Sequence, residues 1–265
     1  MAAAIHLNAR GSGPAVVLLH SCPGRASYFD PIVEALAPRH LTLTADLPGY
    51  GTSPRLKTPY SLERAIELLA EALRGAGVER CAVVGHGLGT YRALQLALSG
   101  AVQVDRIVGL GGFASLGGPY RVALRRIADL WEKTSFDFMP LWQHNVFEPG
   151  WLLAHPDEAA PMLDWLRDTP RDLLGQETRA AANSEDLTHQ LALLEIPIYL
   201  RWGARDLATP LSWGHQIERM APRATLEEVV GRGHYLLLDD HAATVEAVSR
   251  FLGPAAAESP FRGTS

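Results

Sequence analysis

The chain has 265 residues and a mass of 28.8 kDa, enough for one large domain or for a domain with an insertion. Apolar residues make up 47% and charged residues 20%, ordinary globular proportions that exclude disorder as a description of the whole chain. The formal net charge is −5 with no block of like charges, which argues against a general nucleic-acid binder.

The sequence gives no support for a membrane or exported protein. Its uncharged stretches, such as Ile107 to Tyr120, are shorter than the roughly 20 apolar residues of a membrane helix. The start, MAAAIHLNAR, lacks a basic segment followed by an apolar one, so export is not predicted. Two cysteines, Cys22 and Cys81, cannot build a disulfide framework and suggest no metal site. We therefore expect a cytoplasmic protein without a metal.

Apolar runs typical of strands alternate with helical periodicity over the first 110 residues. The runs are Ala4 to Ala9, Ala15 to His20, Leu41 to Asp46, Cys81 to Val84 and Arg106 to Leu110. The segment Gly11 to Pro14 predicts a turn between two antiparallel strands. A helix capped by Ser61 is predicted after the third run, because apolar residues recur there at spacings of three and four: Leu62, Ala65, Ile66, Leu69 and Leu73. This alternation predicts a mostly parallel sheet covered on both faces.

The pattern changes between residues 114 and 194, where strand signals vanish and prolines recur. Four of the six tryptophans fall in this stretch: Trp131, Trp142, Trp151 and Trp165. They can fill a helical core of their own, line an apolar substrate pocket, or do both. Strands resume at Pro197 to Trp202 and at Ala224 to Val230, with helices near Pro210 to Met220 and His241 to Leu252. We predict a core at 1–113 and 195–253, a helical cap at 114–194, and a disordered tail at 254–265.

The strongest local signal is the run Val83-Val84-Gly85-His86-Gly87-Leu88-Gly89-Thr90, in which a strand turns into a helix through glycines. It resembles the nucleophile elbow of the α/β-hydrolase family, G-x-S-x-G, whose middle residue stands above the sheet. The serine of that pattern is absent, because Gly87 holds its position. Glycine should keep the turn or relieve its strain, since the elbow residue adopts a backbone conformation that only glycine adopts at little energetic cost.

Further segments resemble the same family, in the order that its fold requires. The run His20-Ser21-Cys22-Pro23-Gly24 is similar to the H-G-x-P-G oxyanion loop, with Ser21 in place of glycine. Asp46 to Ser53 is similar to the segment D-x-P-G-x-G-x-S. Trp202 to Pro210 resembles the acid loop, and Gly231 to His234 the histidine loop. The resemblance covers about residues 4–253 and implies an α/β-hydrolase fold, a mostly parallel sheet with helices on both faces and an inserted helical cap.

The resemblance also implies a role for each matching residue. His234 is the expected base and Asp206 its partner, a pair that can move protons near neutral pH. Backbone N–H groups of Leu88 and Cys22 are expected to form an oxyanion hole. Gly87 stands at the nucleophile position with no side chain to react. A merely structural Asp206–His234 hydrogen bond is the alternative for the pair.

Two other expectations concern the surroundings of this site. Ser21 or Cys22 could act as a displaced nucleophile beside the oxyanion loop. The pocket is expected to be lined by residues beside the motifs and by the tryptophans of the insertion: Ser21, Arg25, Tyr28, Tyr91, Trp131, Trp142, Trp151, Trp165 and Tyr235.

A dinucleotide cofactor is a poor fit for the glycine-rich turn. Gly85, Gly87 and Gly89 form G-x-G-x-G rather than G-x-G-x-x-G. The turn follows a central strand instead of the first one, and no acidic residue ends the next strand. We therefore expect no cofactor.

Four hypotheses on function remain open. The favoured one is an enzyme for an apolar, carbonyl-containing small molecule, with His234 and Asp206 as a general base for lyase, cyclisation, elimination or direct water attack. In the second, Gly87 replaces the natural serine in an inactive variant of a serine esterase, lactonase or peptidase. The third is a non-catalytic ligand binder, and the fourth a scaffold without a ligand. The expected partner is a small molecule, not nucleic acid or membrane, and a homodimer is an open possibility.

Overall fold

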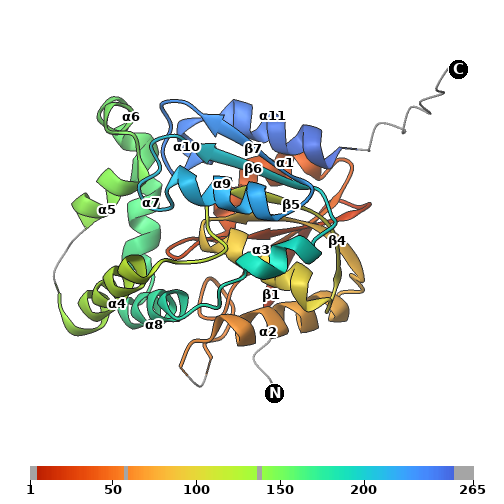
Figure 1. The fold of residues 1–265 in the computed structure, drawn as a ribbon, viewed down its shortest axis with the longest axis horizontal. Helices are drawn as coiled ribbons and strands as arrows, with labels where there is room; N and C mark the ends of the chain where they lie inside the picture. Colours follow the sequence, from red (N-terminus) through yellow and green to blue (C-terminus); the bar gives the residue numbers. More distant parts are fainter. Residues whose placement is uncertain (1–4, 57–58, 136–138, 254–265) are drawn as a thin grey trace, which may run out of the picture.

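Seven strands form one sheet at the centre of the described residues, which are 5–56, 59–135 and 139–253 of a computed structural model (Figure 1). The strands are β1 (His6–Arg10), β2 (Ala15–Leu19), β3 (Leu41–Asp46), β4 (Arg80–His86), β5 (Gln103–Leu110), β6 (Ile198–Gly203) and β7 (Ala224–Val229). Their order across the sheet is β1-β3-β2-β4-β5-β6-β7. β1 is antiparallel to β3, and the other neighbours are parallel. The predicted mostly parallel sheet is confirmed.

β1 and β2 run in opposite directions, as expected, but they do not pair with each other. β3 lies between them, with His6 of β1 opposite Asp46 and Ala15 of β2 beside Leu41. The connection at residues 11–14 therefore crosses the start of β3, where the Leu41 N–H donates to the Pro14 carbonyl at 3.1 Å. A hairpin would place β2 beside the edge strand β1, whereas here both of its edges carry parallel partners and Val16 to Leu19 are buried.

Two layers of helices cover the faces of this sheet. One face carries α1 (Asp30–Leu36) and α11 (His241–Leu252), with η1 (Ala26–Phe29) and α10 (Leu236–Asp239) near them. The other carries α2 (Leu62–Gly75), α3 (Leu88–Ser99) and α9 (Leu211–Met220), together with η2 (Thr188–Leu193). The predicted cap of α2 is present, because the Ser61 hydroxyl accepts from the Arg64 N–H at 3.1 Å.

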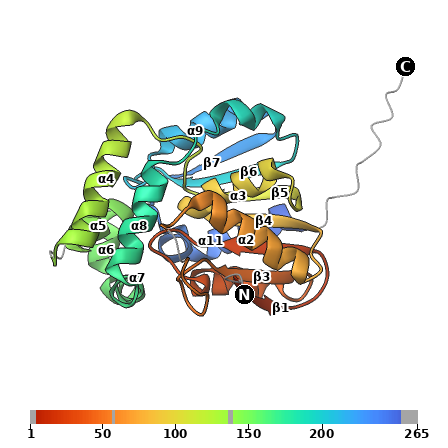
Figure 2. The same ribbon diagram turned by 90° about the horizontal axis from the view of Figure 1, so that it is seen from below.

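Five helices lie between β5 and β6 and gather at one side of the sheet, drawn in green in Figures 1 and 2. They are α4 (Gly118–Lys133), α5 (Met139–Val146), α6 (Pro149–Ala154), α7 (Pro156–Asp168) and α8 (Arg171–Ala182). α4 and α8 pack along each other. Their role as a cap stays a prediction, and the predicted tail at 254–265 lies outside the described residues. No described helix has the length and apolarity that a membrane span requires.

Candidate active site

The turn between β4 and α3 consists of one residue, Gly87, with φ of 56° and ψ of −117°. Strand and helix approach closely here, since a Cβ on Gly85 would overlap the backbone of Gly89. A Cβ on Gly89 would in turn overlap the Leu19 carbonyl of β2. The two flanking glycines are therefore required by the close packing of strand and helix.

His234 and Asp206 meet beside this turn. His234 Nδ1 and Asp206 Oδ2 are 2.7 Å apart, and the two side chains are only 4% and 1% exposed. Because Nδ1 faces the carboxylate, Nε2 is left to face the elbow. A Cβ on Gly87 would lie 3.0 Å from His234 Nε2. The structure thus brings together three residues that the sequence places far apart.

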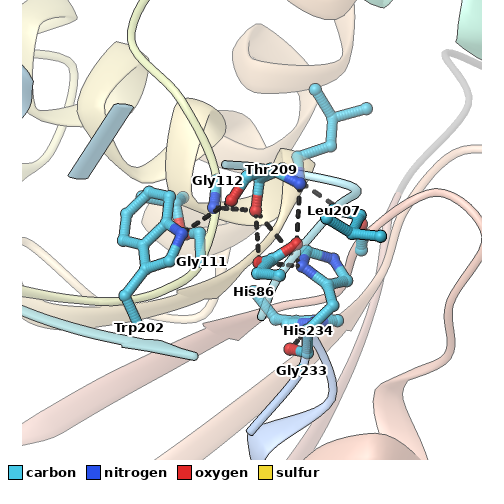
Figure 3. Close-up of polar contacts among 12 residues, drawn as sticks. His86, Gly111, Gly112, Trp202, Leu207, Thr209, Gly233 and His234 are labelled. Atoms are coloured by element: carbon cyan, nitrogen blue, oxygen red, sulfur yellow. Dashed lines mark hydrogen bonds and ion pairs between the residues drawn. The ribbon is translucent and has the colours of Figure 1, made fainter. Parts of the chain in front are cut away.

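Thr209 supports the acid loop and was given no role by sequence reasoning. Its N–H donates to Asp206 Oδ1 and its hydroxyl to Asp206 Oδ2, both at 2.7 Å. The Thr209 hydroxyl oxygen also accepts from the Gly112 N–H at 3.0 Å, and the Trp202 indole donates to the Thr209 carbonyl at 2.7 Å (Figure 3). A threonine three residues after an aspartate, in a turn, is a signal that could have identified it.

Ser21 fills the space beside Gly87. A Cβ on Gly87 would overlap the Ser21 hydroxyl oxygen and lie 3.0 Å from Ser21 Cβ. The Leu88 N–H, at the first position of α3, donates to Ser21 Oγ at 3.3 Å. The Leu88 N–H, one of the two expected oxyanion-hole donors, is therefore hydrogen-bonded to Ser21. The Cys22 N–H, the other donor, has no hydrogen bond within the part of the chain that the structure describes.

Comparison with known proteins agrees with this geometry. A family model described as the alpha/beta hydrolase fold matches residues 14–241. The chain belongs to the alpha/beta hydrolase fold family.

Individual members of this family are similar over most of the chain. A pimeloyl-(acyl-carrier protein) methyl ester esterase of Nitrosomonas europaea is 27% identical over 242 residues, covering 88% of this chain and 93% of the esterase. A solved hydrolase from Pseudomonas aeruginosa PA01 is 26% identical, with a TM-score of 0.85 and 94% of each chain covered. The enol-lactonase from Burkholderia xenovorans LB400 is 21% identical, with a TM-score of 0.85 and coverage of 94% and 96%. This last likeness shows the shared α/β-hydrolase fold.

Two buried histidines hold the loops of this hydrolase-fold site in place. The Leu47 N–H donates to His20 Nε2 at 3.2 Å, so Nδ1 carries the hydrogen and donates to the Ser21 carbonyl at 2.7 Å. Burial lowers the pKa of His20 to about 4, which keeps it neutral. His86 Nε2 lies 3.2 Å from the His234 carbonyl oxygen, and burial holds the pKa of His86 well below its ordinary value.

A second buried polar cluster lies behind the oxyanion loop and was missed by sequence reasoning. Arg92 on α3 and Glu177 on α8 form an ion pair in which both side chains are fully buried. Tyr50 donates its hydroxyl hydrogen to Glu177. Burial and the nearby Glu177 charge raise the pKa of Cys22 well above its ordinary value. The Cys22 thiol therefore stays protonated, which argues against Cys22 as a displaced nucleophile.

A cavity of about 710 Å³, counting the space open to solvent, lies over the elbow. Ser21, Cys22, Gly87, Leu88 and His234 form its floor. The remaining walls are mostly apolar and come from the inserted helices, the neighbouring loops and α9: Pro23, Phe113, Leu116, Tyr120, Leu124, Ile127, Trp131, Trp142, Thr178, Ala181, Ala208, Thr209 and Trp213. Along α4 the lining residues 120, 124, 127 and 131 recur at spacings of four and three, a helical signal that could have predicted them.

The structure corrects the expected pocket lining for six residues. Of the nine, Ser21, Trp131 and Trp142 line this cavity, whereas Arg25, Tyr28, Tyr91, Trp151, Trp165 and Tyr235 do not.

Each of the six lies elsewhere for a definite reason. Arg25 pairs with Asp168 on the surface. The other five side chains pack against other rings: Tyr28 contacts Trp165 and Tyr235, Tyr91 stacks on the cavity residue Phe113, and Trp151 stacks on Phe147 and His155. The tryptophans of the insertion are thus divided between cavity wall and internal packing.

Proposed function

We propose that this protein is a hydrolase that uses His234 as a general base to cleave an ester-type bond in an apolar small molecule. The observation that carries the proposal is the buried His234–Asp206 hydrogen bond of 2.7 Å, whose imidazole lines an apolar cavity at the elbow. A structural hydrogen bond alone would not require the free imidazole nitrogen to face such a cavity.

The catalytic cycle follows from this arrangement. His234 Nε2 takes the proton of the attacking hydroxyl while Asp206, bonded to Nδ1, stabilises the imidazolium that forms. The negative charge that develops on the substrate oxygen is stabilised by the Cys22 N–H and by the positive end of the α3 dipole. His234 then returns the proton to the leaving alcohol. The net reaction adds water to the ester and releases an acid and an alcohol.

The cavity supports an apolar, uncharged substrate. No lysine, arginine, aspartate or glutamate is found among the described residues that line it. Charged substrates would lose their hydration there without a compensating ion pair. Hydrolysis is favoured over lyase, cyclisation or elimination chemistry by the similarity to a methyl ester esterase and an enol-lactonase.

The surroundings of Gly87 favour a natural glycine over a replaced serine. Any side chain at position 87 would overlap the Ser21 hydroxyl. Ser21 in its present orientation and a side chain at position 87 therefore compete for one space, so that glycine at position 87 fits the serine at position 21 as it lies here.

The test uses a panel of p-nitrophenyl esters with acyl chains of increasing length. His234→Ala should reduce kcat/KM by about 100-fold or more. His189→Ala, a change at an exposed histidine away from the cavity, should leave it unchanged. Binding of an apolar ester analogue, followed by the fluorescence of the cavity tryptophans Trp131, Trp142 and Trp213, should be nearly unchanged in His234→Ala.

Two outcomes would contradict the proposal. Unchanged ester turnover in His234→Ala would show that His234 is not the base. Tight binding of the analogue by a protein that hydrolyses no ester in the panel would favour the non-catalytic binder.

A further inference from the structure

We propose that the Ser21 hydroxyl is the nucleophile of this enzyme, supplied from the oxyanion loop in place of the side chain that the elbow lacks. This inference rests on the proposed function, because it needs His234 as the base. It adds a covalent step and a specific residue that forms it.

Position is the first argument. The three atoms nearest to the point where a Cβ on Gly87 would lie are Ser21 Oγ, His234 Nε2 and Ser21 Cβ, all within 3.0 Å. The Ser21 hydroxyl and the imidazole nitrogen thus converge on the place where an elbow nucleophile would stand. Ser21 lines the cavity and is 6% exposed, so a bound ester can reach its oxygen while bulk water is largely excluded.

Activation is the second argument. The Leu88 N–H donates to Ser21 Oγ at 3.3 Å from the N-terminus of α3, a helix of 12 residues. A donor at a helix N-terminus favours an oxygen that is acquiring negative charge. No hydrogen bond joins Ser21 Oγ to His234 in the described contacts, and rotation about the Ser21 Cα–Cβ bond can form one when substrate binds. His20 holds the backbone of this loop through the Ser21 carbonyl at 2.7 Å.

Two other cavity hydroxyls, those of Thr209 and Tyr120, and the Cys22 thiol are already engaged. The Thr209 hydroxyl donates to Asp206, and the Tyr120 hydroxyl donates to the Leu207 carbonyl at 3.2 Å. The Cys22 thiol is directed toward Glu177, and burial raises the pKa of Cys22 well above its ordinary value. Ser21 is therefore the cavity side chain best placed to exchange a proton with His234.

Ser21 Oγ forms a bond to the ester carbonyl carbon while its proton passes to His234 Nε2. The tetrahedral intermediate collapses, its bond to the alkoxide oxygen breaks, and the alcohol leaves with the proton from His234. Water then attacks the acylated Ser21, giving its proton to His234, and the acid leaves as the proton returns to Ser21 Oγ.

The experiment combines active-site labelling with two matched serine variants. A fluorophosphonate should modify the parent protein, and mass spectrometry of the digested protein should locate the adduct on Ser21. Ser21→Ala should remain unlabelled, with kcat for p-nitrophenyl butyrate reduced about 100-fold or more. Ser27→Ala, at an exposed serine in η1, six residues further along the chain and outside the cavity, should behave as the parent. Circular dichroism and denaturation of Ser21→Ala check that it is folded.

The results separate the two proposals. If His234→Ala loses ester turnover while Ser21→Ala keeps it, the base assignment stands and the nucleophile is water, which overturns the inference on Ser21. An adduct on a residue other than Ser21, or no adduct in a protein with His234-dependent turnover, overturns it as well. If His234→Ala keeps turnover, the proposed function itself has failed.

Discussion

Ser21 occupies the space that a side chain on Gly87 would need, although the two residues lie on different loops. A Cβ on Gly87 would overlap Ser21 Oγ and lie 3.0 Å from Ser21 Cβ. Gly87 also has φ of 56°, a conformation that residues with a Cβ rarely adopt. Glycine at the elbow and serine in the oxyanion loop are therefore coupled by packing.

Gly87→Ser should destabilise the protein by about 1–3 kcal/mol, because the new side chain overlaps Ser21 and strains the turn. Adding Ser21→Gly should restore part of this loss, since the overlapping hydroxymethyl group is removed. Urea denaturation of the parent, both single variants and the double variant measures the coupling energy. Strictly additive effects of the two changes would show that the side chains do not compete for space.

The Arg92–Glu177 ion pair connects α8 of the insertion with α3, the helix that follows the elbow. Burial alone would raise the pKa of Glu177, but the Arg92 charge and hydrogen bonds from Cys22 and Tyr50 bring it below its ordinary value. Glu177→Gln should destabilise the protein by about 3–5 kcal/mol, because it leaves the Arg92 charge buried without a counter-charge. Chemical denaturation measures this loss.

A double variant provides the control for that prediction. Arg92→Met combined with Glu177→Leu removes both charges and keeps the buried volume roughly constant. Its stability should exceed that of Glu177→Gln, since no uncompensated charge remains. A double variant as unstable as Glu177→Gln would mean that packing, and not charge, explains the loss.

Asp239 makes the stability depend on pH. Its Oδ2 accepts from the Gly233 N–H at 2.7 Å, whereas Oδ1 has no hydrogen-bond partner among the described residues. Burial raises the pKa of Asp239 to about 7; the charge of Asp240 also raises it, while Arg232 and His234 lower it. The folded state therefore binds the proton of the Asp239 carboxyl more tightly than the unfolded chain does. The stabilisation that this protonated carboxyl contributes is fully present below about pH 4 and is lost as the pH rises through about 7.

Asp239→Asn should remove this dependence, because the amide does not titrate and its oxygen can still accept from Gly233. Between about pH 5 and pH 8 the parent should lose roughly 3 kcal/mol more stability than the variant. Urea denaturation of both proteins at the two pH values is the measurement. Parallel losses in the two proteins would show that the carboxyl of Asp239 does not titrate in this range.

Ile127 on α4 lines the cavity and should limit the length of the acyl group. Ile127→Ala should shift the preference among p-nitrophenyl esters toward longer chains, by about fourfold for each methylene group that gains a buried site. Val122→Ala changes a residue on the same helix that is 56% exposed, and should leave the preference unchanged. An identical chain-length profile for the parent and Ile127→Ala would mean that the acyl group binds elsewhere.

The fold could be predicted from the sequence because its signals are local. Alternating apolar runs predict the strands, Ser61 predicts the start of α2, and the glycines around residue 87 predict a tight turn from strand to helix. Asp206 and His234, in the loops after β6 and β7, were predicted through the resemblance of these loops to the acid and histidine loops of the family. Family resemblance then adds an expected role to each of these positions.

Features that depend on contacts between distant parts of the chain could be seen only in the tertiary structure. The insertion of β3 between β1 and β2, the pairing of Arg92 with Glu177 and the division of the tryptophans between cavity and core all join segments distant in sequence. Ser21 and Leu88 are 67 positions apart, and their hydrogen bond exists because parallel strands end at the same edge of the sheet. Periodicity determines which residues are buried, but packing determines which of them meet. The glycine at position 87 is therefore visible in the sequence, whereas the Ser21 hydroxyl beside it is visible only in the fold.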